Sequence, residues 1–151
     1  ALWSELVAGG ATPSGFRTLE AGRIEAGEPR YGADVTQEHL FSEVNLPGAV
    51  SYTKGCYVGQ EIVTRVRTRG KVNRVRAGLK VEGPAAAGDE ILQDGKTVSR
   101  ITSCATSPGL GTTLAFSYLR PEVAGAPGAP LSVRTREGLL RAAVAPYPFL
   151  P

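Results

Sequence analysis

The second half of the chain contains six short apolar or β-branched runs, and their spacing limits the folds open to it. The runs are Arg76–Val81, Glu90–Gln93, Thr97–Cys104, Thr112–Leu119, Leu131–Thr135 and Leu140–Ala145. Every gap between them contains glycine, and most gaps also contain proline, aspartate or serine. Short strands separated by such turns are typical of a small antiparallel barrel. We therefore expect a six-stranded β-barrel in this half of the molecule.

The first part of the chain follows a different pattern, in which glycine and proline interrupt short helical segments. The apolar spacing predicts helices over 2–8, over 16–24 and from 34 to 44. With the boundary near residue 72, the expected fold class is α+β. A helical and mixed segment over 1–71 precedes the barrel over 72–151.

The segment before the boundary has two competing patterns. Between Ile62 and Arg69, apolar or threonine residues mostly alternate with arginine, which is typical of a strand. In a helix, Glu61 and Arg65 would instead form an i,i+4 ion pair. The pattern alone leaves both structures open. We expect a helix up to about Thr68, partly because of the family resemblance given below.

Composition excludes several protein classes. Hydrophobic residues make up 42% and charged residues 21% of the chain, so a disordered protein is not expected. No signal peptide and no run of about 18 apolar residues occurs, which argues against a membrane partner. Two cysteines and one histidine predict neither a disulfide scaffold nor a metal site. We expect a cytoplasmic protein without a metal in this chain.

The charge of the chain is concentrated in one run. The net charge is +3, yet seven cations and no acid lie between positions 62 and 80. They are Arg65, Arg67, Arg69, Lys71, Arg74, Arg76 and Lys80. Such a run is either a solvated face or a site for phosphate or several carboxylates. No aromatic residue occurs between Val58 and Phe116, so the base-stacking residues of single-strand binders are missing there.

Cys56 is the candidate nucleophile. It follows Lys54-Gly55 and precedes a predicted helix start near Gly59. A helix N-terminus and a nearby cation both favour the reactive thiolate. The alternative is a small buried apolar residue beside Tyr57. Cys104, at the end of a strand run, is interpreted as structural.

Two further groups are candidate site residues. Arg23 and Glu25 are two positions apart on a predicted helix, so they do not share a face. One would project into a site while the other braces it, or both would form surface ion pairs. Tyr31 occupies a turn, where its ring would stack on a flat ligand or simply pack.

The segment 54–61 reads KGCYVGQE and resembles the signature KGCYxGQE of the YgfZ-type family, which is related to the glycine-cleavage T-protein aminomethyltransferases. The matching residues are Lys54, Gly55, Cys56, Tyr57, Gly59, Gln60 and Glu61. Residues 23–34 resemble the Arg-x-Glu-Ala-Gly-x-Pro-x-Tyr-Gly block of both branches, and residues 98–104 and 148–149 resemble barrel and C-terminal motifs.

The resemblance implies a fold and a ligand. Residues 1–71 would be the C-terminal part of a folate-binding domain whose N-terminal half is missing, and 72–151 the barrel. This fits a chain that opens as if inside a helix, without methionine. The implied cofactor is tetrahydrofolate, including its polyglutamylated form. The implied folate contacts are Glu25, Arg23, Arg76 and Tyr31, and the residue associated with activity is Cys56.

Three functions remain open at this point. The first is a folate-binding accessory protein of iron–sulfur cluster maintenance or tRNA modification, with an iron–sulfur protein or tRNA as partner. The second is an enzyme, a tetrahydrofolate-dependent aminomethyltransferase, against which Cys56 argues because it matches the other branch. The third is a non-catalytic module that binds RNA or protein through the basic run.

Overall fold

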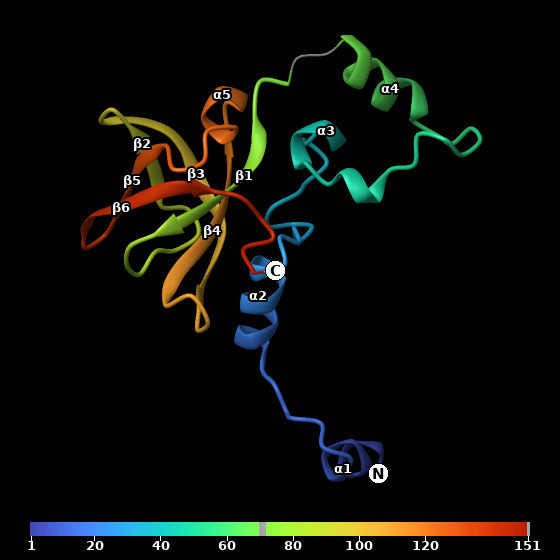
Figure 1. Cartoon of the computed structure of the whole chain (residues 1–151), viewed down its shortest axis with the longest axis vertical. Helices are drawn as coiled ribbons and strands as arrows, with labels where there is room; N and C mark the ends of the chain where they lie inside the picture. The colour runs from blue at the N-terminus through green and yellow to red at the C-terminus, as the bar shows by residue number, and fades with distance from the viewer. Residues whose placement is uncertain (70–71, 151) are drawn as a thin grey trace.

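The computed structural model describes the backbone of residues 1–69 and 72–150, and the side chains of all of these except 66–69. A barrel and a string of short helices make up the chain, with the helices extending away from the barrel on one side (Figure 1). Within the described residues, no helix has both the length and the apolar character that a membrane crossing requires.

Six antiparallel strands close into the barrel in the order β1-β4-β3-β2-β5-β6. They are β1 (Val75–Val81), β2 (Glu90–Gln93), β3 (Lys96–Ser107), β4 (Thr112–Leu119), β5 (Pro130–Thr135) and β6 (Gly138–Ala145). All six predicted runs are confirmed as strands. The largest difference is at β3, which continues to Ser107. Its first part pairs with β2 and its second part with β4, and the register shifts between Ile101 and Ser103.

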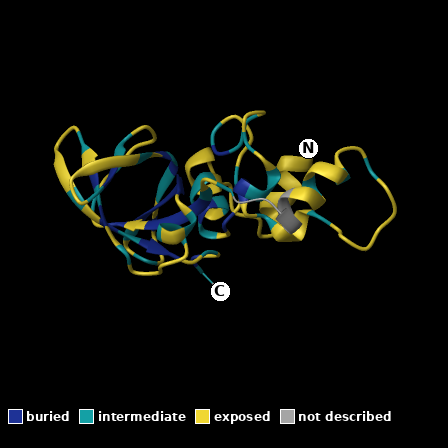
Figure 2. Ribbon diagram, turned by 90° about the horizontal axis from the view of Figure 1, so that it is seen from above, coloured by how far each residue is buried: buried dark blue, intermediate teal, exposed yellow. Residues whose placement is uncertain are grey.

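The barrel interior is filled by aliphatic side chains from all six strands. The fully buried ones include Leu79, Ile91 and Val133, and alanines of β1, β4 and β6 belong to the same cluster. Figure 2 shows that buried positions are concentrated along the strands of the barrel. β4 is buried on both faces: Ala115 points into this interior, while Phe116 belongs to a second cluster outside it. A strand with an apolar layer on each side reads as a continuous apolar run, as the sequence of β4 does.

The helices are α1 (Leu2–Ala8), α2 (Phe16–Glu25), α3 (Phe41–Val44), the 3₁₀ turn η1 (Pro47–Ala49), α4 (Gln60–Arg69) and α5 (Pro121–Ala124). The helix expected from position 34 is wrong in its start, because α3 begins only at Phe41. Residues 34–40 form turns instead. Asp34 and Thr36 hydrogen-bond to nearby backbone or side-chain groups, and such local bonds compete with a helix. For residues 60–69 the helix is confirmed over the strand.

α2 is the helix that packs on the barrel. Its Ile24 is completely buried in the second cluster, together with Leu114 and Phe116 of β4 and Phe149 of the C-terminal segment. Gly78 of β1 allows the C-terminal segment to pack closely on this strand, since a Cβ at this position would lie 2.7 Å from the Phe149 ring and from the Ala145 carbonyl oxygen. The second core thus fixes α2 against the outer face of β4.

Residues 41–69, here called the arm, leave the barrel and carry α3, η1 and α4 (Figure 1). α3 contacts β1 and α4 contacts α3, so the arm is attached at its base. Most of its residues beyond α3 are exposed. α1 lies at the opposite end of the molecule and contains no buried residue.

Candidate functional site

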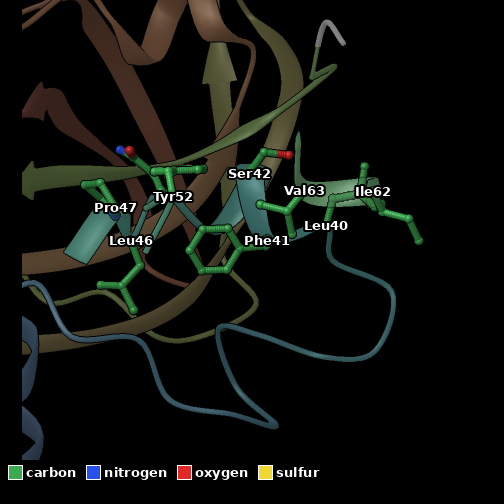
Figure 3. A pocket seen from close by; sticks show the side chains of 9 residues that line it. Leu40, Phe41, Ser42, Leu46, Pro47, Tyr52, Ile62 and Val63 are labelled. Carbon is green, nitrogen blue, oxygen red and sulfur yellow. The ribbon is translucent and has the colours of Figure 1, made fainter. Parts of the chain in front are cut away.

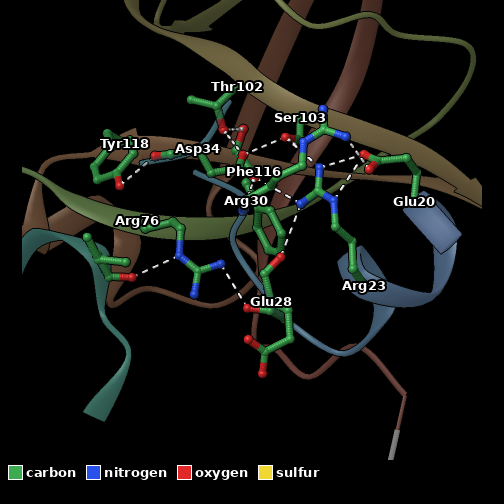
Figure 4. Close-up of polar contacts among 12 residues, drawn as sticks. Glu20, Arg23, Glu28, Arg30, Asp34, Arg76, Thr102, Ser103, Phe116 and Tyr118 are labelled. Carbon is green, nitrogen blue, oxygen red and sulfur yellow. Dashed lines mark hydrogen bonds and ion pairs between the residues drawn. The ribbon is translucent and has the colours of Figure 1, made fainter. Parts of the chain in front are cut away.

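The carboxylate of Asp34 is the centre of a buried polar cluster between α2 and β3 (Figure 4). Its Oδ1 accepts hydrogen bonds from the hydroxyls of Thr102 (2.5 Å) and Ser103 (2.6 Å). Its Oδ2 accepts from Nη1 of Arg23 (2.9 Å) and from the backbone N–H of Arg30 (3.0 Å). These four donors, one of which is the cationic guanidinium of Arg23, offset the cost of burying this charge. We call these five residues the Asp34 cluster.

The guanidinium of Arg23 hydrogen-bonds to several groups of its own chain. Its Nε and Nη2 donate to Oε2 of Glu20 at 3.0 and 2.7 Å, and Nη2 also donates to Ser103 at 2.9 Å. Nη1 donates to Asp34 and to the carbonyl of Glu28. The hydrogen bond from Arg23 lowers the pKa of the Glu20 carboxyl. The folate contact expected for Arg23 stays a prediction.

Glu25, two residues later, also contacts β3. Its Oε1 accepts a 2.5 Å hydrogen bond from the Ser107 hydroxyl, and its backbone carbonyl accepts from the Phe149 N–H at 2.7 Å. Arg23 reaches Ser103 and Glu25 reaches Ser107, four positions apart on one strand. Both side chains therefore hydrogen-bond to β3, at positions four residues apart.

Arg76 lies in β1 with 1% of its surface exposed. Its Nε donates to the Val44 carbonyl (2.8 Å) and its Nη1 to the Gly27 carbonyl (2.9 Å) (Figure 4). The guanidinium lies 4.6 Å from the ring centroids of both Phe116 and Tyr147. Burial lowers the pKa of Arg76, yet an arginine keeps its charge at neutral pH. Within the described residues, Nη2 has no hydrogen-bond partner.

Residues 54–61, here called the signature loop, are mostly exposed. Cys56 is a free, exposed cysteine in irregular backbone. Gly59 has φ of 89° and α4 begins at Gln60, so the helix start expected near Gly59 is confirmed. The ammonium of Lys54 lies 5.7 Å from the centre of the Tyr57 ring. The interpretation of Cys56 as a buried apolar residue is therefore wrong.

Cys104 differs from Cys56 in each respect. It is partly buried, its thiol donates to the Ala85 carbonyl at 3.2 Å, and burial raises its pKa to about 11. A protonated, hydrogen-bonded thiol is a poor nucleophile. This agrees with a structural role for Cys104.

The predicted site residues form two groups. Arg23, Glu25 and Arg76 lie around the end of α2 and the barrel, whereas the signature loop lies beyond α3, toward the far end of the arm (Figure 1). Tyr31 is 69% exposed, in a turn that bridges to Val35. Its folate role, like the roles of the signature loop residues, stays a prediction.

Sequence reasoning missed the partners that hold this arrangement. Asp34 and Ser103 stood inside the recognised motifs without a role, Ser107 was assigned to a turn, and Tyr118 was assigned only to a strand. Buried polar residues within otherwise apolar strands were the available signal, because such groups need partners.

The basic run is not one surface. Arg76 is buried, Lys80 is exposed on β1, and Arg74 places Nε 3.4 Å from a Glu43 carboxylate oxygen. The side chains of Arg67, Arg69 and Lys71 lie outside the described residues.

Comparisons with known proteins agree with this architecture. The family model described as the glycine cleavage T-protein C-terminal barrel domain matches residues 74–150. An aminomethyltransferase of Thermosynechococcus vestitus is 33% identical over 150 residues, 98% of this chain and 40% of its own length. A putative chloroplastic transferase of Arabidopsis thaliana is 31% identical over 123 residues, 82% of this chain and 28% of its own length.

A solved structure shows the same fold. The glycine cleavage system aminomethyltransferase T of Bartonella henselae superposes with a TM-score of 0.77 and 23% sequence identity. The match covers 87% of this chain and 37% of that one. This chain thus spans about two fifths or less of the length of these relatives. The chain belongs to the family of glycine cleavage T-protein C-terminal barrel domains.

Proposed function

We propose that the protein is a folate-binding accessory protein of iron–sulfur cluster maintenance or tRNA modification in the cytoplasm, with Cys56 as its functional thiol. The observation that carries this proposal is the exposure of Cys56 in the signature loop, while Cys104 is shielded. An exposed cysteine without a packing role is kept for its chemistry more often than for stability.

The residues of this chain fit tetrahydrofolate in part. Glu25 is half-buried and uses Oε1 for Ser107, which leaves its other oxygen for an N–H of the pterin. Tyr31 exposes a ring that can stack on a flat ligand. Arg23 and Arg76 bind their own chain instead, and Arg76 presents almost no surface. We therefore assign them to holding the Glu25 segment in place.

In this proposal the folate itself would supply one-carbon chemistry when bound. Residues 1–71 contribute one wall of its site, and the barrel over 72–151 supports that wall through β3. The rest of the site belongs to a preceding N-terminal half. The relatives support this division, because each is more than twice as long as the segment it shares with this chain.

The second candidate is a tetrahydrofolate-dependent aminomethyltransferase. The similarity to bacterial proteins named aminomethyltransferase favours it. In that case Cys56 would be dispensable, because the chemistry would take place on folate rather than at a thiol.

One substitution separates the two candidates. In the longer protein that contains this chain, Cys56→Ser should abolish the restoration of iron–sulfur enzyme activity in cells that lack the gene, with folate affinity unchanged. Cys104→Ala is the matched control and should restore activity. Full restoration by Cys56→Ser, together with aminomethyl transfer in a reconstituted glycine-cleavage assay, would establish the second candidate instead.

A further inference from the structure

The hydroxyl of Ser107 is the direct partner of the Glu25 carboxylate. Ser107 is the last residue of β3, it is completely buried, and it donates to Oε1 of Glu25 at 2.5 Å. A hydrogen bond to a carboxylate is charge-assisted and is stronger than one between neutral groups. The consequence of losing this bond depends on which other contacts hold Glu25.

The turn after β3 fixes the direction of the Ser107 hydroxyl. The backbone N–H of Leu110 donates to Oγ of Ser107 at 3.2 Å, and the N–H of Gly111 donates to the Ser107 carbonyl at 2.9 Å. A hydroxyl has a single hydrogen, so an oxygen that accepts from Leu110 keeps its own proton for Glu25. Leu110 is itself packed against the second core. The turn between β3 and β4 therefore presents a fixed donor to the carboxylate.

Other contacts already hold the backbone of Glu25. Ile24, the preceding residue, is completely buried, and the Glu25 carbonyl accepts from the Phe149 N–H at 2.7 Å. Arg23 joins the same turn of α2 to the Asp34 cluster. The end of α2 is thus anchored by three contacts that do not use the Glu25 side chain. The Ser107 hydroxyl is left to determine the orientation of the carboxylate itself.

A carboxylate of fixed orientation binds a ligand better than a mobile one. Ordering a glutamate side chain costs rotamer entropy, and a side chain that is ordered beforehand avoids this cost when the ligand arrives. Because Ser107 occupies Oε1, the other carboxylate oxygen of Glu25 is the one offered to a donor of the ligand. Glu25 is half-buried, so this side chain is within reach of a ligand.

The apolar pocket of the arm, between α3, η1 and α4, offers no comparable acceptor (Figure 3). It has a volume of about 230 Å³ and is lined mainly by apolar side chains, among them Phe41, Leu46 and Ile62. The described lining contains no charged side chain, and neither Glu25 nor Tyr31 belongs to it. A pterin has several N–H donors, so Glu25 suits it better than this pocket does.

We propose that Ser107 is a positioning residue of the folate site: its hydroxyl orients the Glu25 carboxylate toward the N–H groups of the pterin. Ser107 acts through Glu25 and does not touch the ligand. The inference rests on the folate binding proposed above and adds a barrel residue to a wall assigned to residues 1–71. The barrel thereby contributes to the affinity for the ligand as well as to the support of that wall.

Calorimetry on the longer protein that contains this chain tests this role, with folinic acid, a stable tetrahydrofolate derivative, as the probe. Ser107→Ala should weaken binding roughly tenfold, since one hydrogen bond to a charged group is lost. Ser107→Thr keeps the hydroxyl and should bind as the wild type does. Ser117→Ala is the matched control. Ser117 is also completely buried, but its hydroxyl bonds within the barrel, so folate affinity should stay unchanged.

A double substitution separates positioning from a structural role. If Ser107 acts through Glu25, Ser107→Ala should have no further effect on folate affinity in a Glu25→Ala protein. A merely structural serine would weaken binding by the same factor in both backgrounds. Urea unfolding of each variant shows that it is folded. The double substitution decides the question even where threonine does not fit the buried position.

Two results would overturn the positioning role. One is folinic acid binding by Ser107→Ala as tight as by the wild type. The other is an equal loss of affinity from Ser107→Ala with and without the Glu25 side chain. Failure of the proposed function gives a different result, because the wild-type protein itself would not bind folinic acid, and the role of Ser107 would fall with it.

Discussion

Tyr118 connects the barrel to the turn that carries Asp34. Its hydroxyl donates a 2.9 Å hydrogen bond to the backbone carbonyl of Asp34, and only 6% of its surface is exposed. The rings of His39 and Tyr118 are 4.4 Å apart, and the Arg74 guanidinium lies 5.4 Å from the Tyr118 ring. Burial raises the pKa of Tyr118 to about 12. The folded protein thus holds this proton more tightly than the unfolded chain does.

This proton gives the free energy of unfolding a pH dependence. The stabilisation is fully present below the ordinary tyrosine pKa of about 10 and is lost as the pH rises toward about 12. We expect Tyr118→Phe to lower stability by about 1 kcal/mol at pH 8 and to flatten the alkaline decline. Urea unfolding followed by circular dichroism at pH 8 and 11 measures both effects. Parallel alkaline declines in the two proteins would contradict the assignment.

α2 and β3 are held together by polar as well as apolar contacts. Ile24 contributes the apolar part, and the Asp34 cluster and the Glu25–Ser107 hydrogen bond contribute the polar part. Polar bonds with fixed geometry set the register of the helix along the strand, which apolar packing alone leaves less defined. The position of Glu25 therefore depends on the serines of β3.

Removing the central carboxylate tests this dependence. Asp34→Ala removes an acceptor that Arg23, Thr102 and Ser103 share, although Arg23 keeps its ion pair with Glu20. Each buried donor left unsatisfied costs about 1–3 kcal/mol, so we expect a loss of about 3 kcal/mol. Glu90→Ala is the control. It breaks two ion pairs on the exposed side of the barrel, each contributing at most about 1 kcal/mol. Equal losses of unfolding free energy in the Asp34→Ala and Glu90→Ala proteins, measured by urea unfolding, would contradict a larger stabilising contribution from the Asp34 cluster.

Elements with a strong local signal were predictable from the sequence, and contacts between distant elements were not. The strands were readable because each has β-branched or apolar residues bounded by turn residues, as in β2 and β4. The late start of α3 could not be predicted from the sequence, because it depends on hydrogen bonds of the Asp34 and Thr36 side chains. The Asp34–Ser103 contact joins residues 69 positions apart, and no local pattern reports such a pair.

The molecule as a whole is organised around two apolar cores that share β4. One fills the barrel, and the other joins α2, the outer face of β4 and the C-terminal segment. Tyr147 in that segment donates to the Arg76 carbonyl at 3.1 Å and accepts from Asn45 at 3.0 Å. The last residues therefore connect the barrel to α2 and to the base of the arm.

The substitution Phe149→Ala tests whether the two cores unfold separately. Phe149 is 9% exposed and packs against Phe116 with ring centroids 6.0 Å apart, so its truncation should cost about 3 kcal/mol. Amide exchange should accelerate in α2 while the strands of the barrel stay protected. Leu139→Ala, at a residue 65% exposed, should change neither. Uniform acceleration over barrel and helix would mean that the two cores unfold as one unit.

The absence of buried residues in α1 also determines how this protein can be followed in solution. Trp3 is the single tryptophan of the chain, it lies on α1, and it is 66% exposed. Its indole is hydrated before the barrel unfolds and after it, so its emission should already be that of tryptophan in water. We expect the fluorescence maximum to shift little across a urea titration that abolishes the β-sheet circular dichroism. In a longer protein or a complex, a blue shift of this same emission would instead report that α1 has become covered.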